Sequence, residues 1–303
     1  TATKVAQYKF VATYGAATIN DLTLNVFGST GSSATTTINA TDVASLTVGG
    51  VTAPVICNGV CYAKVSGLNI SIPAGVAGQT IDVTANLNNV TSATQGGATT
   101  RSQVGVVLDK YSYKIGNTVT SDASASYVAS NVMVLVASVP TVAAASDTPL
   151  GMSSGFAGSG NTEVMKFTVT AGANPINLKN VGFTPIYSGS LTATSTQLVS
   201  IYDSNNLNTA LGTFAVGNSA QQGSLAFNND YVIGANSSAK FVVKVDTTGT
   251  FTTGQSFRLD LTAAGDTAIS TGTNWQWNDS TVTGYGNGFL VKNLPVTGNT
   301  FTK

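Results

Sequence analysis

The sequence predicts an all-β protein built from two tandem β-sandwich domains, and three patterns lead to this prediction. Apolar and polar residues alternate with a period of two in runs such as 81–87 and 257–262, as half-buried strands require. Clusters of Gly, Asn and Ser lie between these runs and are typical of turns. The third pattern is a tandem repeat. Many short strands joined by turns favour a sandwich.

The repeat is clearest near the start of each half. The sequence KFVAT at 9–13 returns as KFTVT at 166–170, and Ile19-Asn20 returns as Ile176-Asn177 at the same spacing. A chain of 303 residues has room for two domains of about 150 residues, each with its own core. The duplication therefore predicts two domains of the same kind.

The two copies differ at their front edges. Apolar residues at 104–108 match those at 257–261, and both copies close with an apolar run before a proline, Pro140 or Pro295. A run at 140–156 precedes the second copy but has no counterpart before the first. We therefore expect a first domain over 1–140 that lacks its first strand. We expect a second domain over 141–303 with its own leading strand and a C-terminal tail.

The surface is predicted to be polar but nearly uncharged. Charged residues make up 9% of the chain and the net charge is zero, whereas a typical protein has about 25% charged residues. With 42% hydrophobic residues the chain should fold, because it can bury enough apolar surface to offset the loss of chain entropy. A surface with so little charge repulsion favours self-association.

Composition also argues against several partners. The 13 Lys and Arg residues are scattered and are balanced by 13 acidic residues, so we expect no nucleic-acid groove. The longest apolar run, at 132–137, falls far short of the roughly 20 residues that a membrane-spanning helix needs, so we expect no membrane insertion.

We expect no enzymatic activity and no cofactor or metal. The chain has no His, Glu163 is its only Glu, and the Asp residues are dispersed singly, so no acid–base pair can be assigned. With no His and only two Cys, the usual zinc ligand sets cannot be assembled. We assign no catalytic, cofactor-binding or metal-binding residue.

The two cysteines are predicted to form a disulfide. Cys57 and Cys61 flank Asn58-Gly59, a strong turn signal, so their sulfurs should face each other across a tight hairpin. Disulfides persist in oxidising compartments, which indicates an extracellular, cell-surface location.

Two further features suggest surface chemistry. Five sequons, Asn followed two residues later by Ser or Thr, are possible glycosylation sites: Asn39, Asn69, Asn89, Asn236 and Asn278. Trp275 and Trp277 lie on one face of a predicted strand and could stack on a glycan, although ordinary packing at a contact explains them as well.

The incomplete first domain suggests an assembly device. A missing strand exposes main-chain groups, and a neighbouring copy could fill the gap with its tail after Pro295, giving a head-to-tail homopolymer. The alternative is that the chain is the trimmed part of a longer protein whose missing strand lies upstream. For assembly we expect subunit contacts at Thr1, Val5, Tyr8, Phe10, Met133, Leu135, Val296, Thr300 and Phe301.

The tandem pattern, the composition rich in Thr, Ser, Asn and Gly, and the Val-Pro or Leu-Pro closing each copy resemble immunoglobulin-like subunits of prokaryotic extracellular filaments and surface layers. The resemblance covers the whole chain and implies two immunoglobulin-like sandwiches in a structural subunit of an extracellular filament, polymerised head-to-tail by strand donation. The alternatives are a surface-layer or stalk fragment, or a glycan-binding adhesin module.

Overall fold

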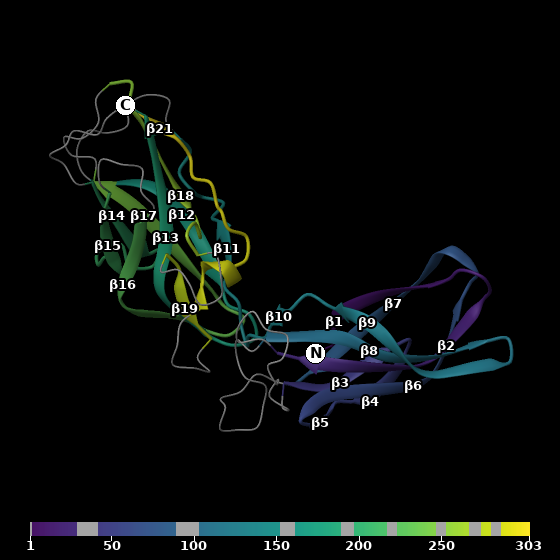
Figure 1. Ribbon diagram of the computed structural model, residues 1–303. Helices are drawn as coiled ribbons and strands as arrows, with labels where there is room; N and C mark the ends of the chain where they lie inside the picture. The colour runs from purple at the N-terminus through teal and green to yellow at the C-terminus, as the bar shows by residue number, and fades with distance from the viewer. Residues whose placement is uncertain are drawn as a thin grey trace. The chain divides into compact units, whose positions relative to one another are not determined.

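The computed structural model describes residues 2–28, 42–88, 103–151, 161–188, 197–216, 223–246, 253–266, 274–279 and 286–303. Within these ranges the chain is almost entirely β, with one short 3-10 helix at Gly288–Leu290. The prediction of an all-β class is confirmed. Contacts divide the chain into unit 1, Thr1–Val136, and unit 2, Ala137–Lys303 (Figure 1). The boundary predicted at Pro140 falls just inside unit 2.

Unit 1 is built from two antiparallel sheets. The first has the order β1 (Ala2–Ala12), β7 (Gly75–Leu87), β3 (Val43–Val48) and β4 (Val51–Pro54). The second has the order β10 (Met133–Val134), β8 (Gln103–Ile115), β2 (Ala17–Phe27), β6 (Val60–Ile72) and β5 (Ile56–Asn58), and β9 (Thr118–Ala129) also pairs with β8.

The core of unit 1 lies between these two sheets. Alternate residues of each strand point inward, so Leu46 and Val83 from the first sheet and Leu22 and Leu24 from the second are fully buried in one apolar cluster. This inward alternation is what the period-two pattern predicts. Unit 1 is therefore a sandwich.

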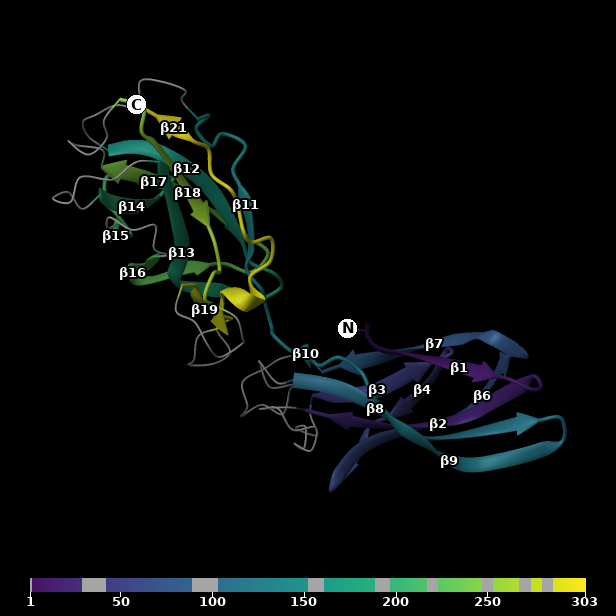
Figure 2. The same ribbon diagram turned by 45° about the horizontal axis from the view of Figure 1, so that its top comes forward.

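Unit 2 has the same two-sheet plan. Its first sheet has the order β11 (Thr141–Ala144), β12 (Asn161–Thr170), β17 (Ser238–Asp246), β14 (Gln197–Asp203) and β15 (Gly212–Val216). The second has the order β20 (Gly286–Asn287), β19 (Gln276–Asn278), β13 (Ile176–Ser188), β18 (Ser256–Leu261) and β21 (Phe301–Thr302), and β16 (Gly223–Ile233) also pairs with β13 (Figure 2).

Aromatic rings fill the core of unit 2. Phe167 from the first sheet lies 6.5 Å from Phe183 of the second and 5.2 Å from Phe241, measured between ring centroids. All three rings are fully buried. Edge-on and tilted ring contacts of this kind add to the stabilisation from apolar burial.

The two units are repeats, and β-bulges fix their alignment. The pairing of β1 with β7 shifts between Lys4 and Ala6, and the pairing of β12 with β17 shifts between Glu163 and Met165. The bulge in β2 after Ile19 likewise has its counterpart after Leu178 in β13. Bulges keep their place in related strands. Lys4 is therefore equivalent to Glu163, and β1 is equivalent to β12.

This alignment corrects the one expected from the sequence. Matching KFVAT with KFTVT equates Phe10 with Phe167, but the bulges make Tyr8 the equivalent of Phe167 and Phe10 the equivalent of Val169. Burial agrees, because Tyr8 and Phe167 are both buried at the same point of their strands. The short sequence match is wrong by two residues. The match of 104–108 with 257–261 holds, since each segment pairs with equivalent residues of β2 and β13.

The C-terminal tail belongs to unit 2. Phe301 pairs with Phe257 of β18 and is 1% exposed, and Val296 exchanges main-chain hydrogen bonds with Leu261. The pairing of Met133 with Val104 occupies the same place in unit 1. The tail therefore corresponds to β10 and the residues before it, so Pro140 and Pro295, which close the two copies in the sequence, do not occupy equivalent places.

We predict that Phe301→Ala destabilises unit 2 and leaves unit 1 unchanged. Removing a fully buried phenyl ring from a packed core costs about 3–5 kcal/mol. Calorimetry of the whole chain should show one transition moved to lower temperature. Leu135→Ala, a core change in unit 1, is the matched control and should move the other transition. Equal movement of both transitions by Phe301→Ala would contradict the assignment of the tail.

Candidate functional site

The candidate site is the outer edge of β1. In the first sheet of unit 1, β1 is the terminal strand, and among the described residues it pairs only with β7. Successive residues of an antiparallel strand direct their main-chain groups to opposite sides. The registers of β4, β3 and β7 place Tyr8 and Phe10 on the β7 side. The N–H and C=O groups of Gln7 and Lys9 therefore face outward.

The equivalent edge of unit 2 is covered by the chain itself. Strand β11 pairs with β12, placing Val142 opposite Val169 and Ala144 opposite Phe167, and Val142 is fully buried. The Ala145 N–H then donates to the Lys166 carbonyl at 2.9 Å. Lys166 is the equivalent of Gln7. The outward groups of β12 thus have partners in a segment that lies beside β12 and has no described counterpart beside β1.

The segment after β11 continues along the edge of β12. The Thr148 hydroxyl accepts a hydrogen bond from the Lys166 N–H at 2.8 Å and donates one to the Lys166 carbonyl. The Asn299 side-chain amide donates to the Pro149 carbonyl at 2.7 Å. A Cβ on Gly151 would overlap the Thr300 carbonyl, so this segment packs tightly against the tail.

Unit 1 has an open groove at the same place. It has a volume of about 480 Å³ and lies between the start of β1 and the residues that join β9 to β10, and it is lined by Lys4, Val5, Ala6, Gln7, Ala129, Ser130, Asn131 and Met133. Because Met133 is the equivalent of Phe301, Asn131 is the equivalent of Asn299. In unit 2, residues 145–151 lie between β12 and the tail. The groove of unit 1 therefore lies between the equivalents of these two segments, which are β1 and the residues before β10.

A second hollow lies at the other end of β1. It has a volume of about 360 Å³, and its apolar wall includes Phe10, Ile19, Tyr111 and Tyr113. The Phe10 ring packs edge-on to Tyr111, whose ring stacks on Tyr113, each with centroids 5.7 Å apart. Phe10 is the equivalent of Val169, the residue opposite Val142 in unit 2. A strand added beside β1 would have one residue opposite Phe10, at the position that Val142 has in unit 2. The hollow lies beside that position.

Charged groups near the edge are few, and Lys4 and Asp82 pair on the β7 side. The Lys4 ammonium lies 2.7 Å from a carboxylate oxygen of Asp82, and the Gln7 amide donates to the same oxygen at 2.7 Å. These hydrogen bonds lower the pKa of Asp82. In unit 2, Asp147 lies 2.6 Å from Lys240 and 3.5 Å from Lys166, and the hydrogen bond from Lys240 is the main cause of its lowered pKa.

The structure places the predicted subunit-contact residues in different surroundings. Val5, Tyr8 and Leu135 are buried in unit 1, and Phe301 is buried in unit 2. Thr1 lies outside the described residues. The half-buried and exposed positions are Phe10, Met133, Val296 and Thr300. Phe10 borders the second hollow, and Val5 and Met133 border the groove.

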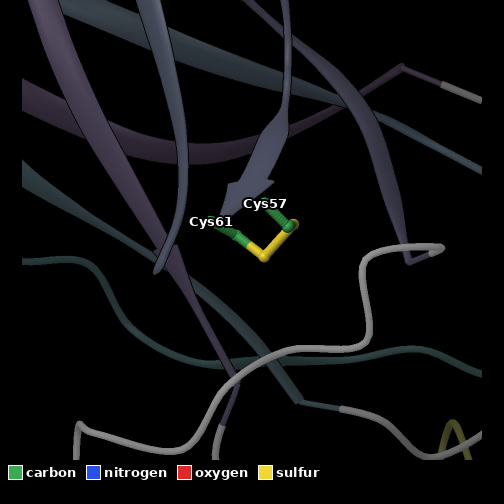
Figure 3. The surroundings of a disulfide bond; sticks show 2 residues. All are labelled: Cys57 and Cys61. Atoms are coloured by element: carbon green, nitrogen blue, oxygen red, sulfur yellow. A yellow bond between two sulfur atoms is a disulfide. The ribbon is translucent and has the colours of Figure 1, made fainter. Parts of the chain in front are cut away.

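The predicted disulfide is confirmed. Cys57 and Cys61 pair across the β5–β6 hairpin, and their sulfurs are bonded at 1.99 Å (Figure 3). Gly59 lies in the left-handed region at φ 77°, which a turn of this tightness requires. The disulfide links β5, the terminal strand of the second sheet, to β6, whereas β1 belongs to the first sheet.

The other predicted surface features have mixed outcomes. Asn69 is exposed within β6, where the pairing with β2 is irregular, and Asn236 is exposed in a turn, whereas Asn278 is only 7% exposed. Asn39 and Asn89 lie outside the described residues. Trp275 and Trp277 are fully buried, which excludes a glycan platform there and agrees with the alternative of ordinary packing.

A buried carboxylate explains the position of the Trp275 segment. Asp266 accepts main-chain hydrogen bonds from Trp275 at 2.9 Å and from Gly288 at 3.0 Å, and the Trp275 indole donates to the Thr262 carbonyl at 2.9 Å.

Within the described ranges, no group of three or more His, Cys, Asp or Glu residues could hold a metal ion. No helix there has the length and apolarity to cross a membrane.

Comparison with known proteins identifies no family. No protein-family model and no curated protein matches the chain. A crystal structure of a presumed membrane-anchored protein from Corynebacterium diphtheriae aligns with 9% identity over 100% of this chain and 88% of its own, with a TM-score of 0.18. A structure containing manganese lipoxygenase of Gaeumannomyces graminis and part of zonadhesin of Komagataella pastoris aligns with 11% identity over 99% and 87%, with a TM-score of 0.16. Similarity this low supports no conclusion about fold or function.

We predict that unit 1 loses stability at alkaline pH through Tyr8. The Tyr8 hydroxyl donates to the Val106 carbonyl at 2.9 Å, and burial raises the pKa of Tyr8 from 10.0 to about 12. The folded state therefore holds this proton more tightly than the unfolded state. The resulting stability is fully present below pH 10 and is lost as the pH rises from about 10 to about 12.

Tyr8→Phe tests this assignment. It should lower the stability of unit 1 by about 0.5–1.5 kcal/mol at neutral pH, because the hydrogen bond from Tyr8 is lost while the Ser130 N–H still donates to the Val106 carbonyl at 2.8 Å, and it should flatten the alkaline loss. Tyr231 of unit 2, whose pKa is also raised to about 12, is the internal control, and its transition should keep its pH dependence. An unchanged alkaline profile of unit 1 in Tyr8→Phe would contradict the prediction.

Proposed function

We propose that the chain is a structural subunit of an extracellular assembly, polymerising head-to-tail when a neighbouring copy adds a strand to the β1 edge of unit 1. The observation that carries the proposal is the contrast between equivalent edges. The edge of β12 is covered by residues 141–151, whereas the edge of β1 borders an open groove.

The physical reason for association lies in the main chain. Outward N–H and C=O groups at a sheet edge form a template for another strand, and proteins whose edges stay single blunt them with bulges, charges or a covering segment. Added strands gain main-chain hydrogen bonds along their length, while alternate side chains set the register. The donor and acceptor surfaces of a copy differ, so each copy can accept a strand from one neighbour and donate a strand to another. Repetition of this contact builds a chain of copies.

Composition and chemistry support an extracellular structural role. The net charge is zero and charged residues are 9% of the chain, so electrostatic repulsion between copies is weak. The Cys57–Cys61 disulfide fits an oxidising environment. Each unit packs two sheets around an apolar core, an architecture that suits a structural subunit.

The tail is a less favourable donor than the sequence suggests. Donating residues 295–303 to a neighbour would expose Phe301 and remove the partners of Phe257 and Leu261 in unit 2. Gly298 is also held, because its N–H donates to the buried Asp260 at 2.8 Å. A copy that donates its tail must therefore receive the tail of another copy in the same place. For this reason the proposal rests on the acceptor edge of β1 and not on the identity of the donor.

Lys9→Pro should block assembly without unfolding unit 1. Proline removes the outward N–H of Lys9, while the neighbouring residues Tyr8 and Phe10 keep their pairing with β7. We expect negative-stain images and sedimentation to show dispersed copies, where the wild type forms threads or, in a surface-layer arrangement, lattices.

Two controls separate assembly from folding. Lys9→Thr removes the charge but keeps the N–H, so it should still assemble, although more weakly than the wild type. Thr52→Pro makes the same change on β4, the opposite edge of the sheet, and should also assemble. Wild-type assembly by Lys9→Pro, with the melting temperature of unit 1 preserved, would refute the proposed contact.

A further inference from the structure

We infer that the β1 edge of unit 1 is a sequence-selective acceptor for an extended, nearly uncharged segment with the chemistry of residues 140–151. The inference rests on the proposed function and names what the acceptor recognises. Its basis is the equivalence of β1 with β12, whose edge residues 141–151 already occupy.

The equivalence fixes a register for the added strand. Val142 lies opposite Val169 in unit 2, so a residue at the Val142 position lies opposite Phe10 in unit 1. Its side chain points to the buried side of the sheet, as that of Val142 does. The second hollow, with its wall of Phe10, Tyr111 and Tyr113, lies at this place. The acceptor therefore selects an apolar side chain there and excludes a charged one.

Main-chain groups and Asn131 supply the polar recognition. The outward groups of Gln7 correspond to those of Lys166, which bind Ala145 and the Thr148 hydroxyl. Asn131 corresponds to Asn299, whose amide donates to the Pro149 carbonyl. Asn131 is exposed on the wall of the groove. It is therefore placed to donate to a carbonyl of the added strand.

A positive charge is kept at the same place in both units. In unit 2, Lys240 pairs across the sheet with Thr168 and binds Asp147 at 2.6 Å. In unit 1 the two residue types are exchanged, because Lys9 pairs with Thr80. The exposed Lys9 ammonium can meet an acid at the Asp147 position of an added strand. The edge thus matches a segment with one acidic residue and otherwise no charge.

The experiment uses a labelled synthetic peptide of residues 140–151 and the full chain, diluted to where copies are dispersed. We expect saturable binding by fluorescence anisotropy, with a raised melting temperature of unit 1. A peptide with Val142→Asp should bind at least tenfold more weakly. Asn131→Ala in the protein should weaken binding by about fivefold, the effect of one hydrogen bond. Asn299→Ala is the matched control in unit 2 and should not weaken it.

Four outcomes would overturn the inference. They are no binding of the 140–151 peptide, equal binding of the Val142→Asp peptide, no loss of binding with Lys9→Pro, and tighter binding of a peptide of residues 295–303, which would identify the tail as the preferred donor. The two claims can fail separately. Assembly that Lys9→Pro blocks, without binding of the 140–151 peptide, leaves the proposed function standing and removes this inference. Binding of the 140–151 peptide without assembly of the wild type would remove the proposed function and leave the specificity of the acceptor edge standing.

Discussion

The structure depends on one constraint: the outward main-chain groups at a sheet edge need partners. Each unit is a sandwich of two open sheets. The outward groups of β1 in unit 1, and of its equivalent β12 in unit 2, therefore need partners from outside the rest of the sheet. In unit 2 the chain satisfies this edge with residues 141–151. The same edge in unit 1 borders a groove and an aromatic hollow. Among the described residues, this edge thus pairs with a covering segment in unit 2 and with no strand in unit 1.

The covering segment does more than pair with β12. It also pairs with the segment that follows the 3-10 helix, because the Val142 N–H donates to the Lys292 carbonyl while the Lys292 N–H donates to the Pro140 carbonyl. Val142 is buried between these neighbours, and Asn299 fixes the far end of the segment through Pro149. An added strand in unit 1 would lie between β1 and the residues before β10, which are the equivalents of β12 and the tail.

Several features could be predicted from the sequence because their causes are local. Period-two alternation follows from the geometry of a strand, and Asn58-Gly59 specifies the turn that brings Cys57 and Cys61 together. The alignment of the repeats could not be read from KFVAT and KFTVT, because single-residue bulges after Lys4 and Glu163 set the register. Nor does alternation say which face is covered, and so Trp275 and Trp277 proved to be core residues. The role of the tail depends on pairing with β18, a contact distant in sequence. Asn131 carries no signal until the bulges and β10 align it with Asn299.

The most direct test of the central claim is amide hydrogen exchange, residue by residue, along β1 in dispersed and assembled protein. The account predicts that the Gln7 and Lys9 amides exchange rapidly in dispersed copies and become protected on assembly, while the Tyr8 and Phe10 amides, which face β7, are protected in both states. Rapid exchange of Gln7 and Lys9 in the assembled protein would contradict it.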